Sequence, residues 1–228
     1  MAKNEWEERN TVSGDGQVSK NIYFEGNPAG SPRVMFVGNS ITRHAALESI
    51  GWFYDWGMAA SKKENDYVHK VMSGILKKQP DAAFCVVQAA VWECNYTSKD
   101  YDMWFATAKN FRPDIIICSI SANIQDSLFE HDKYVENIDS LLTYLAGGNE
   151  DVKIFHSSSF FDNTAKNAAI RSYTEKSGAT LVYISDVKND ESNLAIGQWE
   201  HEGIQVHPGD KGMAELATRY LKAIDHLI

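Results

Sequence analysis

The chain has 228 residues, of which 43% are hydrophobic and 23% are charged, and its formal net charge at pH 7 is −9. This length is sufficient for one sizeable α/β domain and is marginal for two. The negative charge argues against nucleic acid, anionic membrane surfaces and polyanionic substrates, because these partners bind basic surfaces. A neutral small molecule or a carbohydrate ester is compatible with this charge.

The cysteines and histidines show no metal-ligand spacing, so no metal and no cofactor is predicted. Cys85 and Cys118 lie in apolar runs, where a thiol behaves as a small buried hydrophobe. The opening MAKNEWEERN is charged and lacks the apolar centre of a signal peptide. No stretch approaches the roughly 20 apolar residues that span a bilayer. A cytoplasmic location is therefore the expectation.

In chain order, the polar, glycine-rich residues 1–32 are predicted to form an N-terminal extension packed on a single domain of residues 33–228. The extension contains one short candidate strand, Asn21–Glu25. Five later runs are short, apolar and mostly continuous, as strands buried on both faces of a parallel sheet are. They are Val34–Val37, Ala83–Gln88, Asp114–Ile120, Val152–His156 and Thr180–Ile184.

Segments with helical spacing of apolar residues separate these strands and follow the last one. They are Ser61–Lys78, Ser98 to about Phe111, His131–Leu145, Asn163–Ser177 and Asp210 to His226. Strands that alternate with helices predict a doubly wound, three-layer α/β/α domain around a five-stranded parallel sheet. In such sheets the functional crevice lies at the carboxyl ends of the strands.

Ser40 directly follows the first of these five strands, so it falls at the functional edge of the sheet. A serine here is either the N-cap of a helix that begins near Ile41 or a nucleophile. His207 is the candidate base, because it precedes the final helix and Pro208 restricts it to an extended conformation.

The segment Gly38–Thr42 (GNSIT) resembles the first motif of the SGNH (GDSL-like) esterase and lipase superfamily, and His207-Pro208 with Gly212 resembles the last. The order of the two motifs along the chain is also that of the family. The resemblance covers about residue 33 to the C-terminus and implies a flavodoxin-like sheet with strand order 2-1-3-4-5. It also implies ester hydrolysis through a serine nucleophile.

The resemblance further implies an oxyanion hole formed by the Ser40 amide, a glycine amide and an asparagine side chain. Gly57 best matches the glycine position, and the alternative is that it is an ordinary turn glycine. Asn123, which follows the third strand, best matches the asparagine position, and Asn95 is its rival. The family usually has glycine where this chain has Ser121.

The third member of the catalytic triad departs from the family pattern. The family places an aspartate three residues before the histidine, and here that residue is Ile204. Glu202 is the favoured substitute. The alternative is that a backbone carbonyl near Ile204 or Gln205 orients His207, which gives a Ser–His dyad.

Aromatic residues crowd the predicted rim of the site. Trp52 and Trp56, together with Tyr54, are candidates for stacking on a sugar ring, and the alternative is that they close the core beneath a long loop. Trp92 and Glu93, which follow the second strand, either shape the pocket or pack beneath it.

Together with the resemblance, these residues predict a serine esterase that hydrolyses short-chain, acetyl-type esters, including esters of carbohydrates. Ser40, His207 and Glu202 would be catalytic, Ser40, Gly57 and Asn123 would form the oxyanion hole, and Trp52, Trp56, Trp92 and Glu93 would contact substrate. The alternative is a non-catalytic carbohydrate-binding or scaffold protein on the same fold. A phosphate- or nucleotide-binding flavodoxin-like module is a weaker alternative, because the chain lacks a P-loop and a glycine-rich dinucleotide loop.

Overall fold

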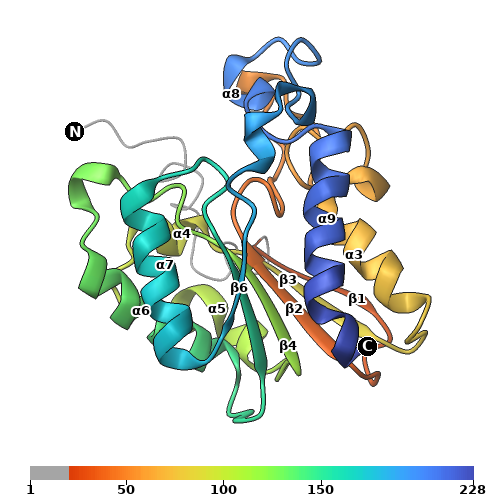
Figure 1. Ribbon diagram of the computed structural model, residues 1–228. Helices are drawn as coiled ribbons and strands as arrows, with labels where there is room; N and C mark the ends of the chain where they lie inside the picture. The colour runs from red at the N-terminus through yellow and green to blue at the C-terminus, as the bar shows by residue number, and fades with distance from the viewer. Residues whose placement is uncertain (1–20) are drawn as a thin grey trace.

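The computed structural model describes residues 21–228, which form a mixed sheet covered by helices on both faces (Figure 1). The strand order is β1-β3-β2-β4-β5-β6. Strands β2 to β6 are parallel, and β1 pairs antiparallel with β3 at one edge. The strands are β1 (Ile22–Gly26), β2 (Arg33–Gly38), β3 (Ala83–Gln88), β4 (Ile115–Ser119), β5 (Lys153–Ser157) and β6 (Thr180–Val182).

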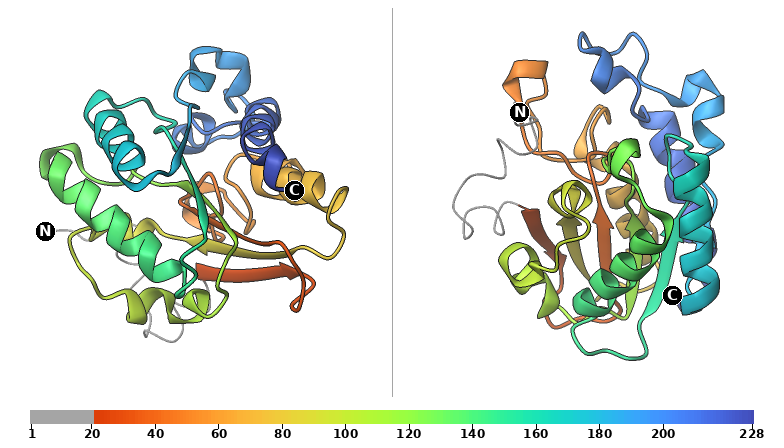
Figure 2. Two further views of the ribbon diagram at one scale, coloured as in Figure 1. Left: turned by 60° about the horizontal axis from the view of Figure 1, so that its bottom comes forward. Right: turned by 90° about the vertical axis from the view of Figure 1, so that its left-hand side faces the viewer.

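The helices lie on both sides of this sheet, as the two turned views in Figure 2 show. They are α3 (Tyr67–Leu76), α4 (Ala90–Cys94), α5 (Tyr101–Lys109), α6 (His131–Leu145), α7 (Thr164–Ser177), α8 (Glu202–Gln205) and α9 (Asp210–Ile224). Six single 3-10 turns lie between or after the larger elements of the described residues: Glu48–Ile50, Lys63–Asn65, Asp126–Leu128, Val187–Asn189, Glu191–Asn193 and Asp225–Leu227.

Two hydrophobic cores result from the alternation of side chains along the strands. In β2, Val34 and Phe36 face the core under α3 and α9, whereas Met35 and Val37 face the core under α4 to α7. All four side chains are fully buried. A strand enclosed on both faces needs apolar residues at every position, which is why these runs are continuous in the sequence.

The predicted three-layer α/β/α architecture is confirmed, and the order of the five parallel strands corresponds to 2-1-3-4-5. The sheet has a sixth strand, because the candidate strand in the predicted extension pairs with β3, with Ile22 opposite Val87 and Gly26 opposite Ala83. Part of the predicted extension, residues 21–32, therefore contributes an edge strand to the sheet. The rest of it, residues 1–20, lies outside the described residues.

Candidate active site

Ser40 lies at the carboxyl end of β2, but it does not cap a helix. The chain after β2 makes a tight turn in which the amides of Thr42 and Arg43 both donate to the carbonyl oxygen of Asn39. The alternative in which Ser40 is the N-cap of a helix that begins near Ile41 is therefore not the observed one. Hydrogen bonds to a distant loop replace helical ones, since the Met58 amide donates to the Ser40 carbonyl and the His44 amide donates to the Trp56 carbonyl.

The turn requires a glycine at its start. A Cβ atom on Gly38 would lie 1.7 Å from the Oγ1 atom of Thr42, whose hydroxyl is itself hydrogen-bonded to the Tyr67 hydroxyl at 2.6 Å. Any larger residue would displace the turn that presents Ser40.

The structure brings Ser40 and His207 together from opposite ends of the fold. The Oγ atom of Ser40 lies 2.7 Å from the Nε2 atom of His207, a hydrogen-bond distance. Ser40 is 8% exposed and His207 is 9% exposed, so protein atoms replace most of the water around the pair. This is the geometry that a serine nucleophile and its general base require.

The other ring nitrogen of His207 fixes the protonation state of the imidazole. Its Nδ1 atom lies 2.7 Å from the carbonyl oxygen of Gly203. A carbonyl can only accept, so Nδ1 carries the proton and Nε2 has a free lone pair. That lone pair faces the Ser40 hydroxyl, so this tautomer can take the serine proton.

Glu202 does not hold His207, and the prediction that its carboxylate completes a triad is corrected. Glu202 is exposed at the start of α8, and the hydrogen bond from Nδ1 goes to Gly203. His207 is the fourth residue after Gly203, and the helical turn of α8 aims the Gly203 carbonyl at the ring. The open alternative of a backbone carbonyl is therefore the observed one, with Gly203 in place of Ile204 or Gln205.

Neighbouring segments fix the position of His207. Its amide donates to the Ile204 carbonyl at 3.0 Å, and its own carbonyl accepts from the Ala195 amide at 3.0 Å. The ring of Phe161 meets the imidazole edge-on, with centroids 5.6 Å apart. Ile204, which stands where the family has aspartate, is fully buried in an apolar cluster with Trp52 and Met58.

Burial lowers the pKa of His207 to about 4, although its hydrogen bond to the Gly203 carbonyl acts in the opposite direction. The ring is therefore the neutral base at all pH values above about 4. We expect the acid limb of kcat/KM for ester hydrolysis to fall near this pKa, with activity nearly constant between about pH 5 and pH 8. Initial rates corrected for spontaneous hydrolysis measure this profile. An acid limb at the ordinary histidine value of 6.5 would contradict the expected effect of burial.

Gly57 is buried, but its amide does not face a reaction site. The N–H donates to the Oδ2 atom of Asp66 at 3.0 Å, which corrects the prediction that it belongs to the oxyanion hole. A Cβ atom here would lie 2.5 Å from the Ile41 carbonyl oxygen, so the close packing of two loops requires the glycine. The alternative, a structural glycine, is the observed one.

Asp66, fully buried, anchors a network of charged groups at the start of α3. It accepts hydrogen bonds from the amide and the Nδ1 atom of His69, both at 2.8 Å. Burial acts to lower the pKa of His69, but hydrogen bonds to Asp66 and Glu25 outweigh it and raise the pKa to about 9. The hydrogen bond from His69 lowers the pKa of Glu25 to about 2, against the opposing effect of burial.

These shifts predict how stability depends on pH. The His69 contribution is complete below its unfolded pKa of 6.5 and is lost as the pH rises through about 9. The Glu25 contribution is complete above 4.5 and is lost as the pH falls towards about 2. We expect the free energy of unfolding to drop by on the order of 2 kcal/mol from pH 6 to pH 9, and we expect His69→Gln to remove most of that drop.

Chemical denaturation at the two pH values measures this difference. His131→Gln is the matched control, because His131 is 42% exposed and its partners, the Asp132 carboxylate and the Ser172 hydroxyl, lie at the surface. If the free energy of unfolding of His69→Gln still drops as much from pH 6 to pH 9 as that of the wild type, the assignment of the pH dependence to this network is wrong.

Asn123 lies in the loop that follows β4, next to the strand that carries Ser40. Its Nδ2 atom donates to the Oε2 atom of Glu93 at 2.7 Å. Glu93 is 1% exposed and also accepts from the Asn39 side chain at 3.1 Å and from the Ser121 amide at 2.6 Å. Burial raises the pKa of Glu93, and these hydrogen bonds oppose the rise. Glu93 is thus a buried acceptor beneath the site, so its predicted role as a substrate contact is corrected.

Two of the three tryptophans predicted to contact substrate are core residues. Trp52 and Trp92 are fully buried. Trp52 packs against Trp199 with ring centroids 5.1 Å apart and thereby joins the loop after Ser40 to the loop before His207. Trp92 packs against Tyr134 in the core under α6. Trp56 is half-buried and stacks on Tyr54 at 4.3 Å, so one of its ring faces is already covered.

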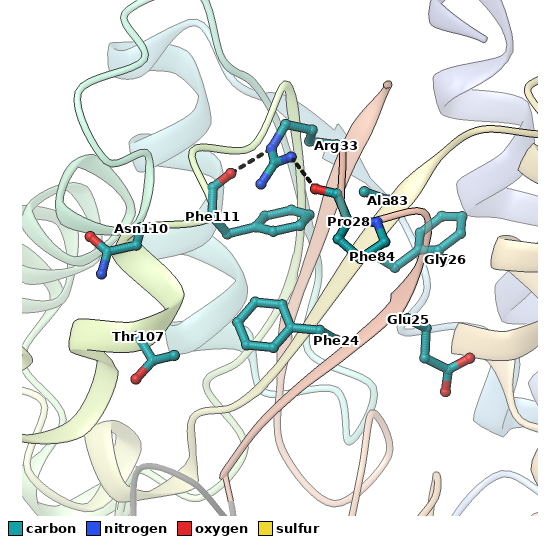
Figure 3. A pocket seen from close by; sticks show the side chains of 10 residues that line it. All are labelled: Phe24, Glu25, Gly26, Pro28, Arg33, Ala83, Phe84, Thr107, Asn110 and Phe111. Atoms are coloured by element: carbon teal, nitrogen blue, oxygen red, sulfur yellow. Dashed lines mark hydrogen bonds between the residues drawn. The ribbon is translucent and has the colours of Figure 1, made fainter. Parts of the chain in front are cut away.

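Two hollows differ in their relation to the catalytic pair. A polar cavity of about 260 Å³ shares Glu93 and Asn123 with the site and is also lined by Asn95, Gln125 and Lys133, among others. A larger, mainly apolar hollow of about 330 Å³ lies at the opposite end of the sheet (Figure 3). Its lining is Phe24, Glu25, Gly26, Pro28, Arg33, Ala83, Phe84, Thr107, Asn110 and Phe111.

The larger hollow is distant from Ser40 and His207. Gly26 and Arg33 both pair with Ala83, at the amino-terminal end of β2 and β3, whereas Ser40 follows their carboxyl ends. Arg33 spans the hollow, with its guanidinium 4.4 Å from the Phe111 ring centroid and hydrogen bonds to the carbonyls of Phe111 and Pro28 (Figure 3). Of these two hollows, the polar cavity is the one that shares residues with the candidate site.

Residues 21–228 contain no group of three or more histidine, cysteine or acidic side chains placed to hold a metal ion. Over the same residues, no helix is long and apolar enough to cross a membrane.

Comparisons with known proteins show the fold. No protein-family model matches the sequence, and neither does any curated protein. Among solved structures, one similar chain is a two-domain esterase active on acetylated mannans, with 18% identity over 92% of this chain and a TM-score of 0.55. This chain spans 56% of the length of that esterase.

Two further structures match along nearly their whole length. The psychrotrophic esterase EstA from Pseudoalteromonas sp. is 11% identical, covers 86% of this chain and 98% of its own, and has a TM-score of 0.58. A carbohydrate esterase family 3 protein from Talaromyces cellulolyticus is 15% identical, with coverages of 86% and 97% and a TM-score of 0.55. The chain has the fold of the SGNH hydrolases, as the GNSIT and His-Pro motifs predicted.

Proposed function

We propose that this protein is a serine esterase that hydrolyses short-chain esters, above all acetyl esters of carbohydrates. The observation that carries the proposal is the 2.7 Å contact between Ser40 Oγ and His207 Nε2, with the Nδ1–H of His207 held by the Gly203 carbonyl. A serine paired in this way to a neutral, correctly oriented imidazole is an activated nucleophile.

The reaction proceeds in two halves. Ser40 Oγ attacks the ester carbonyl carbon while Nε2 of His207 takes the hydroxyl proton. The negative oxygen of the tetrahedral intermediate accepts hydrogen bonds from the Ser40 amide and the Asn123 side chain. Collapse of the intermediate breaks the bond to the alcohol, which leaves with the proton from Nε2. Water then attacks the acyl-serine with His207 again as base, and releases the carboxylic acid and free Ser40.

The Gly203 carbonyl replaces the usual carboxylate of a triad. It orients the ring and the tautomer but supplies no full negative charge to stabilise the imidazolium. Serine hydrolases that lose the triad carboxylate retain part of their catalysis, so a dyad is a workable arrangement. We expect lower turnover than a full triad gives, without loss of mechanism.

Several features favour a small, polar substrate. The cavity beside Asn123 is about 260 Å³ and is lined by amide and charged side chains such as Gln125 and Lys133. The net charge of −9 favours a neutral ester over an anionic one. Similar structures include an esterase active on acetylated mannans and a carbohydrate esterase, which adds support by analogy of fold.

A panel of p-nitrophenyl esters and an acetylated sugar tests the proposal. We expect kcat/KM to be highest for the acetate ester and to fall by at least about 10-fold for the octanoate ester, since the cavity of about 260 Å³ is small and polar side chains line much of it. We also expect release of acetate from the acetylated sugar. Ser40→Ala provides the blank. If the wild-type protein hydrolyses none of these esters, the proposal is wrong.

A second candidate function is carbohydrate binding without turnover. The bond from His207 to a backbone carbonyl, in place of a carboxylate, is the observation that favours it. It predicts binding of the acetylated sugar by calorimetry, with no acetate released by either the wild type or Ser40→Ala.

A further inference from the structure

Glu93 joins three segments that surround Ser40. It lies on α4, directly after β3, and its carboxylate accepts four hydrogen bonds. One comes from the Asn39 side chain after β2, and the others come from the Ser121 amide and from the amide and side chain of Asn123 after β4. The nucleophile follows Asn39 directly in the chain. A single buried carboxylate thus connects the loops that carry Ser40 and Asn123.

The chemistry of this carboxylate determines how the asparagine side chains are oriented. All the groups around it are N–H donors, so the ionised, acceptor-only form fits the contacts. Asn39 and Asn123 must therefore turn their NH₂ groups, and not their carbonyl oxygens, towards Glu93. With a neutral partner that both donates and accepts, either orientation of each amide would be possible.

The Asn123 NH₂ group has two hydrogens, and Glu93 accepts one of them at 2.7 Å. We propose that Glu93 is a positioning residue for catalysis, which holds Asn123 so that the second amide hydrogen is directed at the oxyanion that forms beside Ser40. This inference rests on the proposed esterase function. Glu93 itself touches none of the reacting atoms, because its oxygens are occupied by Asn39, Ser121 and Asn123.

A positioning role and a merely structural role predict different coupling with Asn123. If Glu93 acts through Asn123, removal of Asn123 leaves it nothing to position. If Glu93 only supports the fold, its loss lowers activity independently, and the two effects multiply.

The experiment is a double-mutant cycle of Glu93→Gln and Asn123→Ala, with kcat and KM measured for p-nitrophenyl acetate. We expect Asn123→Ala to lower kcat by about 100-fold and Glu93→Gln by about 30-fold, both with little change in KM. The double variant is expected to lie within about 3-fold of Asn123→Ala alone, whereas independent effects would give a loss of about 3,000-fold.

Controls separate the possible failures. Glu136→Gln on α6 is the matched acid-to-amide change, because Glu136 is 72% exposed and is expected to leave kcat unchanged. If the circular dichroism spectrum shows that Glu93→Gln is unfolded, Glu93→Asp takes its place in the cycle. Aspartate keeps the charge and shortens the side chain by one methylene. If the wild type is active and the losses in kcat of the two single variants multiply in the double variant, the inference about Glu93 is wrong and the proposed function stands. A folded wild type without esterase activity would overturn the proposed function as well.

Discussion

Replacement of Ser40 by alanine is expected to lower kcat for ester hydrolysis by about 10⁴-fold or more, and His207→Ala is expected to do the same. The two side chains act as one unit through the 2.7 Å contact between Oγ and Nε2. The double variant should therefore be no worse than either single variant. Steady-state rates with p-nitrophenyl acetate measure all three.

Glu202→Gln is the control for this pair. Glu202 is exposed and the hydrogen bond from His207 Nδ1 goes to the Gly203 carbonyl, so we expect kcat to stay within about 2-fold of the wild type. A loss of about 100-fold or more in Glu202→Gln would mean that its carboxylate replaces the carbonyl during turnover. Ser40→Ala activity within 10-fold of the wild type would contradict the assigned nucleophile.

Asn123→Ala is expected to lower kcat by about 10² to 10³-fold at nearly constant KM, because it removes a hydrogen-bond donor that strengthens as charge develops on the oxyanion. Asn95→Ala tests the rival assignment. The Asn95 side chain donates to the Val91 carbonyl of α4, the short helix that Asn95 follows, so we expect a loss below about 10-fold.

Asn110→Ala is the matched control for the asparagine variants, because Asn110 lines the hollow at the opposite end of the sheet (Figure 3). We expect its kcat to match the wild type. A larger loss in Asn95→Ala than in Asn123→Ala would move the oxyanion donor from the loop after β4 to the loop after β3.

The parallel strands were predictable because burial on both faces leaves continuous apolar runs. Every residue of β2 from Val34 to Val37 is fully buried, and the run is visible in the sequence for that reason. The short strand Ile22–Gly26 was also visible, but its antiparallel pairing with β3 was not. Edge strands such as this expose most of their side chains, so the sequence says little about which strand is the partner.

The contact between Ser40 and His207 was predictable from two motifs at opposite ends of the domain, because each residue follows a recognisable local pattern. Their partners depend on contacts that no local pattern encodes. Gly57 stands in a loop where a glycine amide could be open to a substrate, yet Asp66 accepts the hydrogen bond from its N–H. Trp52 resembles a rim aromatic, yet it is fully buried and packs against Trp199 from a distant loop.

The third member of the catalytic machinery was ambiguous for a similar reason. Glu202 was attractive because a carboxylate near the histidine completes a familiar pattern. The backbone of α8 decides the outcome, since it turns Glu202 outward and aims the Gly203 carbonyl at Nδ1. A prediction of a helical turn from Gly203 to His207 would have indicated this carbonyl, because such a turn places it beside the imidazole.

Reaction with a fluorophosphonate probe, read by intact mass, tests the central claim most directly. The probe modifies a serine only when a neighbouring base activates it. An active dyad predicts a single adduct on the wild type, located at Ser40 by peptide mapping, and no adduct on Ser40→Ala or His207→Ala. A folded wild-type protein that remains unmodified at large probe excess would contradict the catalytic assignment of Ser40 and His207.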